Sequence, residues 1–420
     1  MSVISVDLAV IGGGPAGLAA AQAAAQAGAG SIVIFDRQQE LGGILTQCIH
    51  NGFGLRYFKE ELTGPEYAQR FIDRLPEYPQ IQVKHGTMVL KLTSDLRIQA
   101  LNSKDGLINY QARAVILAMG CRERPRGAIN IPGSRPAGIF TAGTAQRLMN
   151  IEGYHPGKQV VILGSGDIGL IMARRFTLEG MKVAAVLELM PYSCGLNRNI
   201  VQCLEDFQIP LYLSHTVVEI YGAQRVTGVK VAPVDQKRRP IMEQSFDLDC
   251  DTLVLSVGLI PENELSQMAG VRLDPATGGP VVDSNYQTTV TGIFACGNVA
   301  HVHDLVDDVS EESRIAGRAA AEFIQGKAGF CSSEQLIPVK LGRNVRSIVP
   351  QLLRNDQPTV LYIRAAAPER NVVLKAGCLS FKQRVVTPGE TIRINFTPEM
   401  LKPGDYYLPL SLEKGDDTCD

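Results

Sequence analysis

The segment Val6-Asp-Leu-Ala-Val-Ile-Gly-Gly-Gly-Pro-Ala-Gly17 joins a mainly apolar run to three glycines at the spacing Gly12-x-Gly14-x-x-Gly17. An Ala-rich stretch follows, and Asp36 ends a second apolar run, Ile32–Phe35. In a strand–turn–helix unit with this spacing, the first glycine makes the turn and the second lets a pyrophosphate approach the backbone. The third glycine allows close packing of the helix, and the acid accepts hydrogen bonds from a ribose diol. The segment therefore predicts a dinucleotide-binding βαβ unit.

The same pattern recurs in the middle of the chain. Gly164-x-Gly166-x-x-Gly169 follows Val160–Leu163 and opens an expected helix at Leu170–Glu179, and Glu188 ends the next apolar run. Asp36 lies 24 residues after Gly12, and Glu188 lies 24 residues after Gly164. A single motif of this kind is weak evidence, but two copies in the same register predict that the chain binds two dinucleotides.

Length and composition place the chain among globular enzymes. At 420 residues it is too long for one ordinary core, so two or three domains are expected. Hydrophobic residues make up 45% of the chain and the formal net charge is −2, so no basic excess favours nucleic acid or an anionic membrane surface. The nine cysteines are odd in number and lack paired spacing, which favours reduced thiols.

The N-terminal residues argue against export. Met1–Asp7 contains no basic residue, and the glycines of the first turn interrupt the apolar run that a secretory signal would need. No apolar stretch approaches the roughly 20 residues needed to span a bilayer. We expect a cytoplasmic protein with no membrane span.

Two further apolar runs end at a glycine. Ala112–Met119 ends at Gly120, and Thr252–Val257 ends at Gly258. This pattern is typical of buried parallel strands whose carboxyl ends reach a ligand.

The last part of the chain changes in character. Gly292–Asn298 indicates a strand followed by a glycine turn, and Glu311–Gln325 indicates a helix with an Ala-rich face. Within Ile337–Leu412, short alternating strands such as Thr391–Phe396 and Tyr406–Leu412 are separated by Pro-Gly turns. This region predicts a small β-rich C-terminal domain.

The order of these motifs, over about residues 3–326, resembles the two-dinucleotide-binding-domain flavoproteins of the pyridine nucleotide–disulfide oxidoreductase superfamily. The resemblance implies an α/β fold with two Rossmann-like domains, the second inserted in the first, plus the small β-rich domain. The FAD-binding domain is expected at 1–125 and 275–328, the inserted NAD(P)H-binding domain at 126–274, and the β-rich domain at 329–420.

The resemblance also implies the cofactor contacts. For FAD these are Gly12, Gly14, Pro15, Ala16, Gly17, Asp36, Arg37, Gly42, Gly43, Val89, Gly120, Gly297 and Asn298. For NAD they are Gly164, Ser165, Gly166, Asp167, Ile168, Gly169, Glu188 and Gly258. Glu188 would repel a 2′-phosphate, and Leu189-Met-Pro191 supplies no arginine to receive one, so NADH is favoured over NADPH. Asp167 is awkward beside a pyrophosphate and is expected to cap the helix instead. Asn298 stands where the superfamily usually has Asp.

More narrowly, Gly43-Ile-Leu-Thr-Gln-Cys-Ile-His-Asn-Gly-Phe-Gly54 and Glu60-Glu-Leu-Thr-Gly-Pro65 resemble flavoprotein subunits associated with glycerol-3-phosphate, opine or amino-acid dehydrogenases. This resemblance implies an FAD-dependent oxidoreductase that exchanges hydride between NAD(H) and FAD as an electron-transfer subunit with a partner dehydrogenase subunit. The redox pairs Cys-x4-Cys and Cys-x2-Cys of the superfamily's reductases are missing, so disulfide reduction is not expected.

Two alternatives remain open. The chain could be a nucleotide-binding scaffold subunit whose NAD site is idle, because the glycines and the acid recognise only the adenosine half of a dinucleotide. It could also be a single-cysteine NADH oxidase or peroxidase, with Cys48 as the catalytic thiol. In that case a helix N-terminus or His50 would lower the pKa of Cys48.

The densest group of ligand-type residues is His301, His303, Asp304, Asp307 and Asp308. These side chains could bind a metal, or they could line the flavin or a partner surface. The simplest interpretation is a polar loop leading into the helix at Glu311. The spacing alone does not define a coordination geometry, and we expect no metal site.

Overall fold

The computed structural model describes residues 3–327, 336–401 and 404–415, and its contacts divide the chain into two compact units. The first unit comprises Met1–Cys121 and Pro261–Asp420, and the second comprises Arg122–Ile260. Residues 261–274, which the sequence assigned to the inserted domain, belong to the first unit. The boundary expected between 328 and 329 lies outside the described residues.

The first unit is built on a seven-stranded sheet in the order β5-β2-β1-β8-β7-β6, with β19 also paired to β8. Its strands are β1 (Val3–Ile11), β2 (Ile32–Phe35), β5 (Ile81–Lys84), β6 (Met88–Leu92), β7 (Arg97–Asn102), β8 (Gly106–Leu117) and β19 (Ile293–Ala295). β1, β2, β5, β8 and β19 are parallel, so their carboxyl ends meet at one edge of the sheet. The first glycine turn, Gly120 and Gly297 all follow strands that end at this edge.

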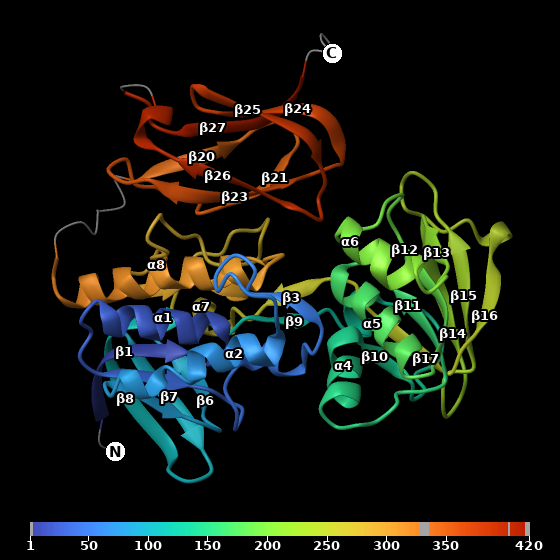
Figure 1. Ribbon diagram of the computed structural model, residues 1–420, viewed down its shortest axis with the longest axis horizontal. Coiled ribbons are helices and arrows are strands. Elements are labelled where there is room, and N and C mark those ends of the chain that lie inside the picture. Colours follow the sequence, from blue (N-terminus) through green and yellow to red (C-terminus); the bar gives the residue numbers. More distant parts are fainter. Residues whose placement is uncertain (1–2, 328–335, 402–403, 416–420) are drawn as a thin grey trace. The chain divides into compact units, whose positions relative to one another are not determined.

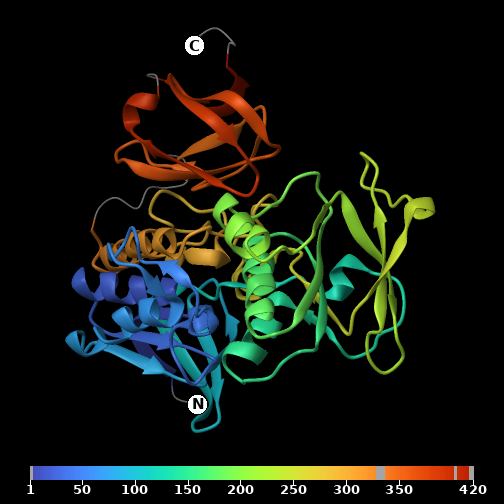
Figure 2. The same ribbon diagram turned by 45° about the vertical axis from the view of Figure 1, so that its right-hand side comes forward.

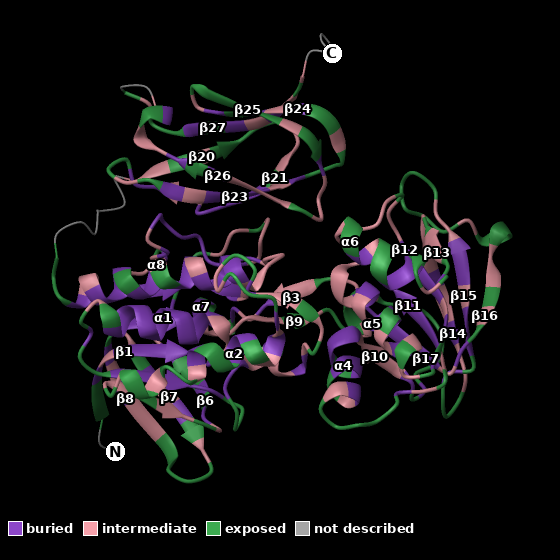
Figure 3. Ribbon diagram, viewed as in Figure 1, coloured by how far each residue is buried: buried purple, intermediate pink, exposed green. Residues whose placement is uncertain are grey.

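Helices α1 (Pro15–Gln26) and α8 (Val306–Ile324) lie side by side next to this sheet (Figure 1). α1 is buried along nearly its whole length, because its alanines leave room for a helix and a sheet on its two sides (Figure 3). At Gly317 of α8 an added Cβ would lie 2.1 Å from the carbonyl oxygen of Ala20, so only glycine permits this approach. α8 begins five residues before the expected start at Glu311, with Asp307 and Asp308 in its first turn.

The remaining elements of this part of the first unit are short. α2 (Gly64–Ile72) begins with a capping box between Thr63 and Glu66. The others are η1 (Gly43–Gln47), β3 (Asn51–Phe53), β4 (Leu62–Thr63), η2 (Leu75–Glu77), α7 (Glu264–Met268) and η5 (Gly297–Val299). β9 (Cys121–Glu123) and β18 (Leu259–Pro261) contain the two points at which the chain passes between the units.

The second unit repeats the plan on a parallel five-stranded sheet in the order β10-β17-β11-β12-β13 (Figure 2). These strands are β10 (Ile139–Thr141), β11 (Gln159–Leu163), β12 (Lys182–Glu188), β13 (Leu211–Leu213) and β17 (Thr252–Leu255). The helices are α3 (Arg126–Ile129), α4 (Ala142–Asn150), α5 (Asp167–Leu178) and α6 (Asn197–Ile200), with η3 (Val201–Glu205) and η4 (Met242–Gln244). A smaller antiparallel sheet contains β14 (His215–Tyr221), β15 (Gly228–Pro233) and β16 (Phe246–Asp249).

The C-terminal part of the first unit consists of β-strands, which confirms the expected β-rich region. One sheet has the order β22-β20-β27-β24-β25 and the other β21-β23-β26. The elements are β20 (Ile337–Leu341), β21 (Val345–Val349), β22 (Leu352–Leu353), β23 (Thr359–Ala365), β24 (Glu369–Ala376), β25 (Leu379–Val386), β26 (Thr391–Phe396), η7 (Pro398–Met400) and β27 (Leu408–Lys414). Alternate side chains of both sheets form a separate apolar core. Across the described residues, no helix is long and apolar enough to cross a membrane.

Candidate dinucleotide sites

The first glycine turn owes two of its three glycines to the fold itself. Gly12 has a φ of +109°, and an added Cβ would lie 2.3 Å from the carbonyl oxygen of Ala118. At Gly17 an added Cβ would lie 1.8 Å from the carbonyl oxygen of Gly12. Close backbone packing therefore requires glycine at both positions, whether or not a ligand is bound.

Gly14 is different, because the fold alone does not require a glycine there. Its φ is −77°, and the atom nearest to an added Cβ is the Cα of Gly43, at 3.8 Å. Gly14 is also the N-cap of α1, where the first amides of a helix are free to bind an anion. A pyrophosphate group is the part of a dinucleotide that a turn with this motif cradles.

Asp36 holds the turn in place from the end of β2. Its Oδ2 accepts the Gly13 N–H at 2.7 Å, its Oδ1 accepts the Gln38 N–H at 2.8 Å, and the side chain is buried. Each carboxylate oxygen keeps a lone pair for a ribose hydroxyl. Arg37 is exposed, and Val89 is buried in β6, two residues after Thr87, whose N–H donates to the Asp36 carbonyl oxygen at 2.7 Å.

Two later segments meet the same turn. The Gly42 N–H donates to the Gly13 carbonyl oxygen at 2.9 Å, and both Gly42 and Gly43 have positive φ. At Gly297 an added Cβ would lie 2.7 Å from the Cβ of Ala16, which follows Pro15 in the first turn of α1. Gly120 has a φ of +72° and open space where a Cβ would be. The structure thus brings the expected glycine segments of the first site together.

The second turn, at β11 and α5, has the same construction. Gly164 has a φ of +102°, and an added Cβ would lie 2.0 Å from the carbonyl oxygen of Ser256. At Gly169 an added Cβ would lie 2.6 Å from the Gly164 carbonyl oxygen. Gly166 has a φ of −67°, and the nearest atom to an added Cβ is the Ser256 hydroxyl at 3.8 Å. As in the first copy, packing within the fold requires glycine at the first and third positions, and only a bound ligand would require it at the middle position.

Glu188 occupies the position that Asp36 has in the first copy. Its Oε2 accepts both the backbone N–H of Ser165, at 2.9 Å, and the Ser165 hydroxyl, at 2.7 Å. Its Oε1 accepts the Met190 N–H at 2.9 Å, and the side chain is buried. Gly258 has a φ of +103° with open space where a Cβ would be, and Ile168 packs partly buried against the core of the second unit.

The expected capping role of Asp167 is wrong. Gly166 is the N-cap of α5, Asp167 lies in the first turn, and its side chain caps no N–H of that helix. Instead its Oδ1 accepts the Leu196 N–H at 2.8 Å and the Asn199 amide at 2.7 Å. The Cys194 N–H also donates to the Ser165 hydroxyl, at 3.2 Å. We call the segment Ser193–Asn199 the second return segment, because it comes back onto its own glycine turn.

A cavity of about 630 Å³ lies in the second unit, beside the carboxyl ends of β10 and β17. Its lining includes Arg126, Arg135, Thr141 and Leu255. The guanidinium of Arg126 donates to the carbonyl oxygens of Ile131, Gly133 and Ser134 and so braces the loop rather than facing a ligand.

Cys48 does not have the environment of a reactive thiolate. Its thiol donates to the Ile44 carbonyl oxygen at 3.3 Å, and burial raises its pKa to about 12. The expectation that His50 or a helix N-terminus would lower this pKa is wrong, because removal from water dominates. None of the seven cysteines in the described part of the chain takes part in a disulfide.

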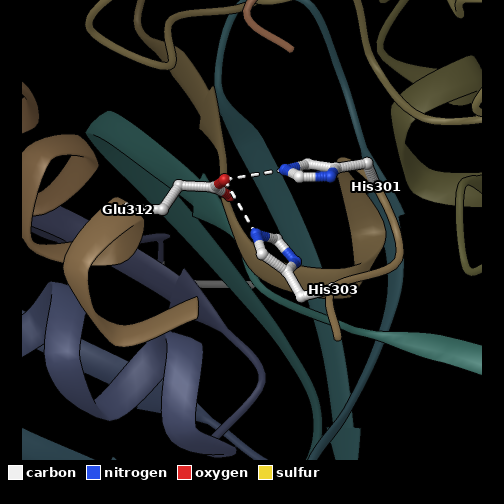
Figure 4. A group of neighbouring side chains, drawn as sticks. All are labelled: His301, His303 and Glu312. Atoms are coloured by element: carbon white, nitrogen blue, oxygen red, sulfur yellow. Dashed lines mark hydrogen bonds and ion pairs between the residues drawn. The ribbon is translucent and has the colours of Figure 1, made fainter. Parts of the chain in front are cut away.

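The five residues of the acidic and histidine-rich segment separate into two groups. Asp304 pairs with Arg364 and Asp308 with Arg393, while the Asp307 carboxylate accepts the Arg56 N–H at 3.2 Å. His301 and His303 instead converge on the buried Glu312 of α8, which the sequence interpretation missed (Figure 4). A signal was present, because Glu312 shares a helix face with Ala316 and Ala320 and so interrupts the Ala-rich face with an acid.

This group of three accounts for the unusual Asn298. The Asn298 Oδ1 accepts the backbone N–H of His303 at 3.1 Å and lies 3.2 Å from its Nδ1. Burial lowers the pKa of His301 to about 4. Burial alone would raise the pKa of Glu312, but the two histidines outweigh it and lower that pKa to about 2. An aspartate at 298 would place a second carboxylate on the other nitrogen of the His303 ring, which the neutral amide avoids.

Comparison with known proteins agrees with this architecture. The pyridine nucleotide-disulphide oxidoreductase family matches residues 6–321. The chain is 26% identical to hydrogen cyanide synthase subunit HcnB of Pseudomonas protegens, covering 82% of this chain and 76% of that protein. It is also 26% identical to an opine oxidase subunit of Agrobacterium tumefaciens, covering 75% of this chain and 64% of that protein. Thioredoxin reductase of T. acidophilum superposes with a TM-score of 0.62 at 26% identity, covering 76% and 98%.

Proposed function

Because the chain belongs to the pyridine nucleotide-disulphide oxidoreductase family, we propose that it carries FAD at the first turn and exchanges hydride with NADH bound at the second. It would act as the electron-transfer subunit of a larger dehydrogenase. The observation that carries this proposal is the repeated turn. In each copy the packing of the fold does not require glycine at the middle position, Gly14 or Gly166, whereas it does at the other two. FAD and NAD(P) binding is typical of the family, and the flavin, when bound, supplies the redox chemistry.

The chain's own residues bind and orient the cofactors. The free amides at the start of α1 would hold the FAD pyrophosphate, and Asp36 would accept hydrogen bonds from the adenosine ribose. In the second copy Glu188 would do the same for NADH and would repel a 2′-phosphate, which supports NADH over NADPH. No acid or base side chain has to transfer a proton in the exchange of hydride itself.

The partner is inferred from two observations. Two relatives, HcnB and the opine oxidase protein, are named as subunits of larger enzymes. In addition, this chain has neither cysteine pair of the superfamily's disulfide reductases, and the thiol of Cys48, which is half-buried, has a raised pKa. A disulfide or thiol route for electrons out of the flavin is therefore unsupported, and a partner subunit that oxidises an organic substrate fits better.

Asp167 favours one alternative function. A carboxylate in the first turn of α5 opposes the binding of an anionic pyrophosphate at that end of the helix. This supports a scaffold subunit whose second site is idle in the isolated chain.

One experiment separates the two functions. The purified full-length chain is examined by visible absorption, and NADH and then NADPH are added without oxygen. Rapid bleaching by NADH, with a slower response to NADPH, is the expected result. A yellow protein that is indifferent to both nucleotides would leave the scaffold function, and a colourless protein would contradict FAD binding.

A further inference from the structure

Three ligand-type side chains converge at one point behind the late glycine turn of the first unit. His301 and His303 lie between η5 and α8, and Glu312 lies on α8. Each histidine places its Nε2 2.9 Å from the same Glu312 oxygen, Oε2, and all three ligand atoms lie within 4.8 Å of one another. Figure 4 shows both rings turned with one nitrogen toward the carboxylate. The Glu312 side chain has no exposed surface, and that of His303 is 2% exposed.

The hydrogen bonds of Asn298 determine which nitrogen of His303 carries hydrogen. A backbone N–H can only donate, so the Asn298 side-chain atom that receives the His303 N–H at 3.1 Å is its oxygen. The His303 Nδ1, 3.2 Å from the same oxygen, must therefore be the donor of that contact. In a neutral imidazole the Nε2 is then a bare lone pair, and it faces the lone pairs of a carboxylate.

A proton or a metal ion has to lie between these two groups. The Glu312 Oε1 accepts the Gly297 N–H at 2.8 Å, but that neutral donor is on the other oxygen. The arginines nearby are already paired with Asp304 and Asp308. Among the contacts of the described residues, no lysine or arginine reaches Glu312. What lies between them is therefore either a proton, on His303 or on Glu312, or a metal ion held by the three ligand atoms.

We propose that His301, His303 and Glu312 bind a divalent first-row transition-metal ion of the Zn²⁺ type. Two imidazole nitrogens and one carboxylate oxygen form a ligand set that such ions take readily, with open positions left for water. With metal–ligand distances of about 2.0–2.2 Å, neighbouring ligand atoms lie about 2.9 Å apart at right angles and about 3.4 Å apart in a tetrahedron. The observed separation of 2.9 Å from each Nε2 to Oε2 fits the lower end of this range.

The surroundings have the features of a supported metal site. Ligand histidines usually donate their second N–H to an oxygen, as the His303 Nδ1 does to Asn298, and ligand carboxylates are themselves hydrogen-bonded, as the Glu312 Oε1 is to Gly297. Tyr362 of β23 packs beside both rings, at centroid distances of 5.4 and 5.8 Å. The ion would thus fix Gly297 and Asn298, the two residues expected beside the flavin, to the start of α8.

The test is metal analysis of the full-length protein. The chain is stripped with a chelator, titrated with Zn²⁺, separated from free ion and analysed for zinc. We expect one ion per chain in the wild type and loss of that ion in His301→Ala, His303→Ala and Glu312→Gln. His155→Ala is the matched control, because this exposed histidine only meets Glu179, at 3.9 Å, and its variant should keep the ion. Zn²⁺ should also raise the Tm of the wild type and of the control, but not of the three variants.

A second measurement covers the case in which a variant does not fold. Co²⁺ is added to the stripped wild-type chain, and X-ray absorption counts the imidazole ligands. Two imidazoles per cobalt are expected. A wild-type chain that retains no more zinc than the variants, or cobalt bound without imidazole, would overturn the proposal. In that event the group between His303 and Glu312 is a proton, and nitrogen NMR of the His303 ring should detect it.

Discussion

The two glycine turns have the same backbone construction but differ in the segments that pack against them. In the first copy the residues after Asp36 return as Gly42-Gly43, and the Gly42 N–H donates to the Gly13 carbonyl oxygen. In the second copy the residues after Glu188 return as the second return segment and meet the turn through the side chains of Ser165 and Asp167. The first helix begins with Pro15 and has no acid in its first turn, whereas the second has Asp167 there.

This difference suggests different residence times for the two nucleotides. A helix N-terminus attracts an anion, and a carboxylate in the first turn cancels part of that attraction. Under the proposed function, the first turn should therefore hold its nucleotide longer than the second turn does. The glycines and the acid have the same spacing in both copies, and the two sites differ in Asp167 and in the segments that pack against each turn.

The largest effects are expected at the first glycines. Gly12→Ala and Gly164→Ala both combine a strained positive φ with a Cβ less than 2.5 Å from a carbonyl oxygen, so each should destabilise its own unit by about 3 kcal/mol or more. Gly12→Ala should yield protein without flavin, while Gly164→Ala should keep the flavin and lose NADH binding. The flavin absorbance per chain measures the flavin content of each variant, and the Tm measures its loss of stability.

Gly180→Ala serves as the control for strain alone. It has a φ of +80° and no atom within 4 Å of an added Cβ, so its cost should be nearer 1 kcal/mol. Equal loss of flavin in Gly12→Ala and Gly164→Ala would contradict separate roles for the two turns.

The middle glycines should affect ligands without affecting the fold. Gly14→Ala and Gly166→Ala introduce a Cβ no closer than 3.8 Å to any atom, so the free energy of unfolding should change by about 1 kcal/mol or less. The new methyl group would occupy the space of the pyrophosphate. We expect at least about tenfold weaker NADH binding in Gly166→Ala and partial loss of flavin in Gly14→Ala, measured by titration and by absorbance. An unchanged Kd in Gly166→Ala would remove the main support for the second site.

A smaller effect with the opposite sign is expected at Asp167. Asp167→Asn keeps an oxygen for Leu196 and Asn199 but removes the negative charge from the first turn of α5. NADH should bind about three- to fivefold more tightly at low salt, and the gain should shrink as salt screens the charge. Glu152→Gln, an exposed acid paired with Arg147 in the same unit, should leave the Kd unchanged. Binding titrations at two salt concentrations measure both variants. Weaker NADH binding in Asp167→Asn would contradict the inference that the Asp167 charge opposes the nucleotide.

The smallest effect is expected at Cys48, in the part of the first copy that follows Gly43. Because its pKa is raised to about 12, the thiolate fraction should be only about one in ten thousand at pH 8. Alkylation of Cys48 should therefore stay slow from about pH 7 to about pH 9, while the exposed Cys378 reacts first. Peptide mass spectrometry follows both sites. Cys48→Ser should leave flavin reduction by NADH within about twofold of the wild type, and loss of that reduction would restore a thiol-based function.

The sequence was sufficient for the plan of the fold but not for contacts between distant segments. The spacing from Gly12 to Asp36 and from Gly164 to Glu188 reflects local strand–turn–helix geometry, so it could be recognised directly. Alternation of side chains likewise revealed β26 at its observed bounds, Thr391–Phe396. The early start of α8 agrees with the sequence, since Asp307 and Asp308 are favourable in a first turn, but a run of polar residues before Glu311 is equally typical of a loop.

Tertiary packing determined the rest. The contact of Asp167 with Asn199 and that of His303 with Glu312 each depend on how a loop folds back, which no local pattern specifies. The raised pKa of Cys48 likewise follows from burial by residues distant in sequence. For this reason the neighbouring His50 predicted the wrong direction for the pKa of Cys48.

The pairing of β8 with β19 sets an order of assembly. These strands are neighbours in one sheet, yet residues 118–292, which include the whole second unit, separate them along the chain. During synthesis the second unit is complete before β19 leaves the ribosome, so it can fold while the edge of β8 still lacks its partner. Gly297 and Asn298, which follow β19, come later still. The flavin pocket should therefore close last, and a nascent chain stopped before residue 293 should contain a folded nucleotide-binding insert but retain no flavin.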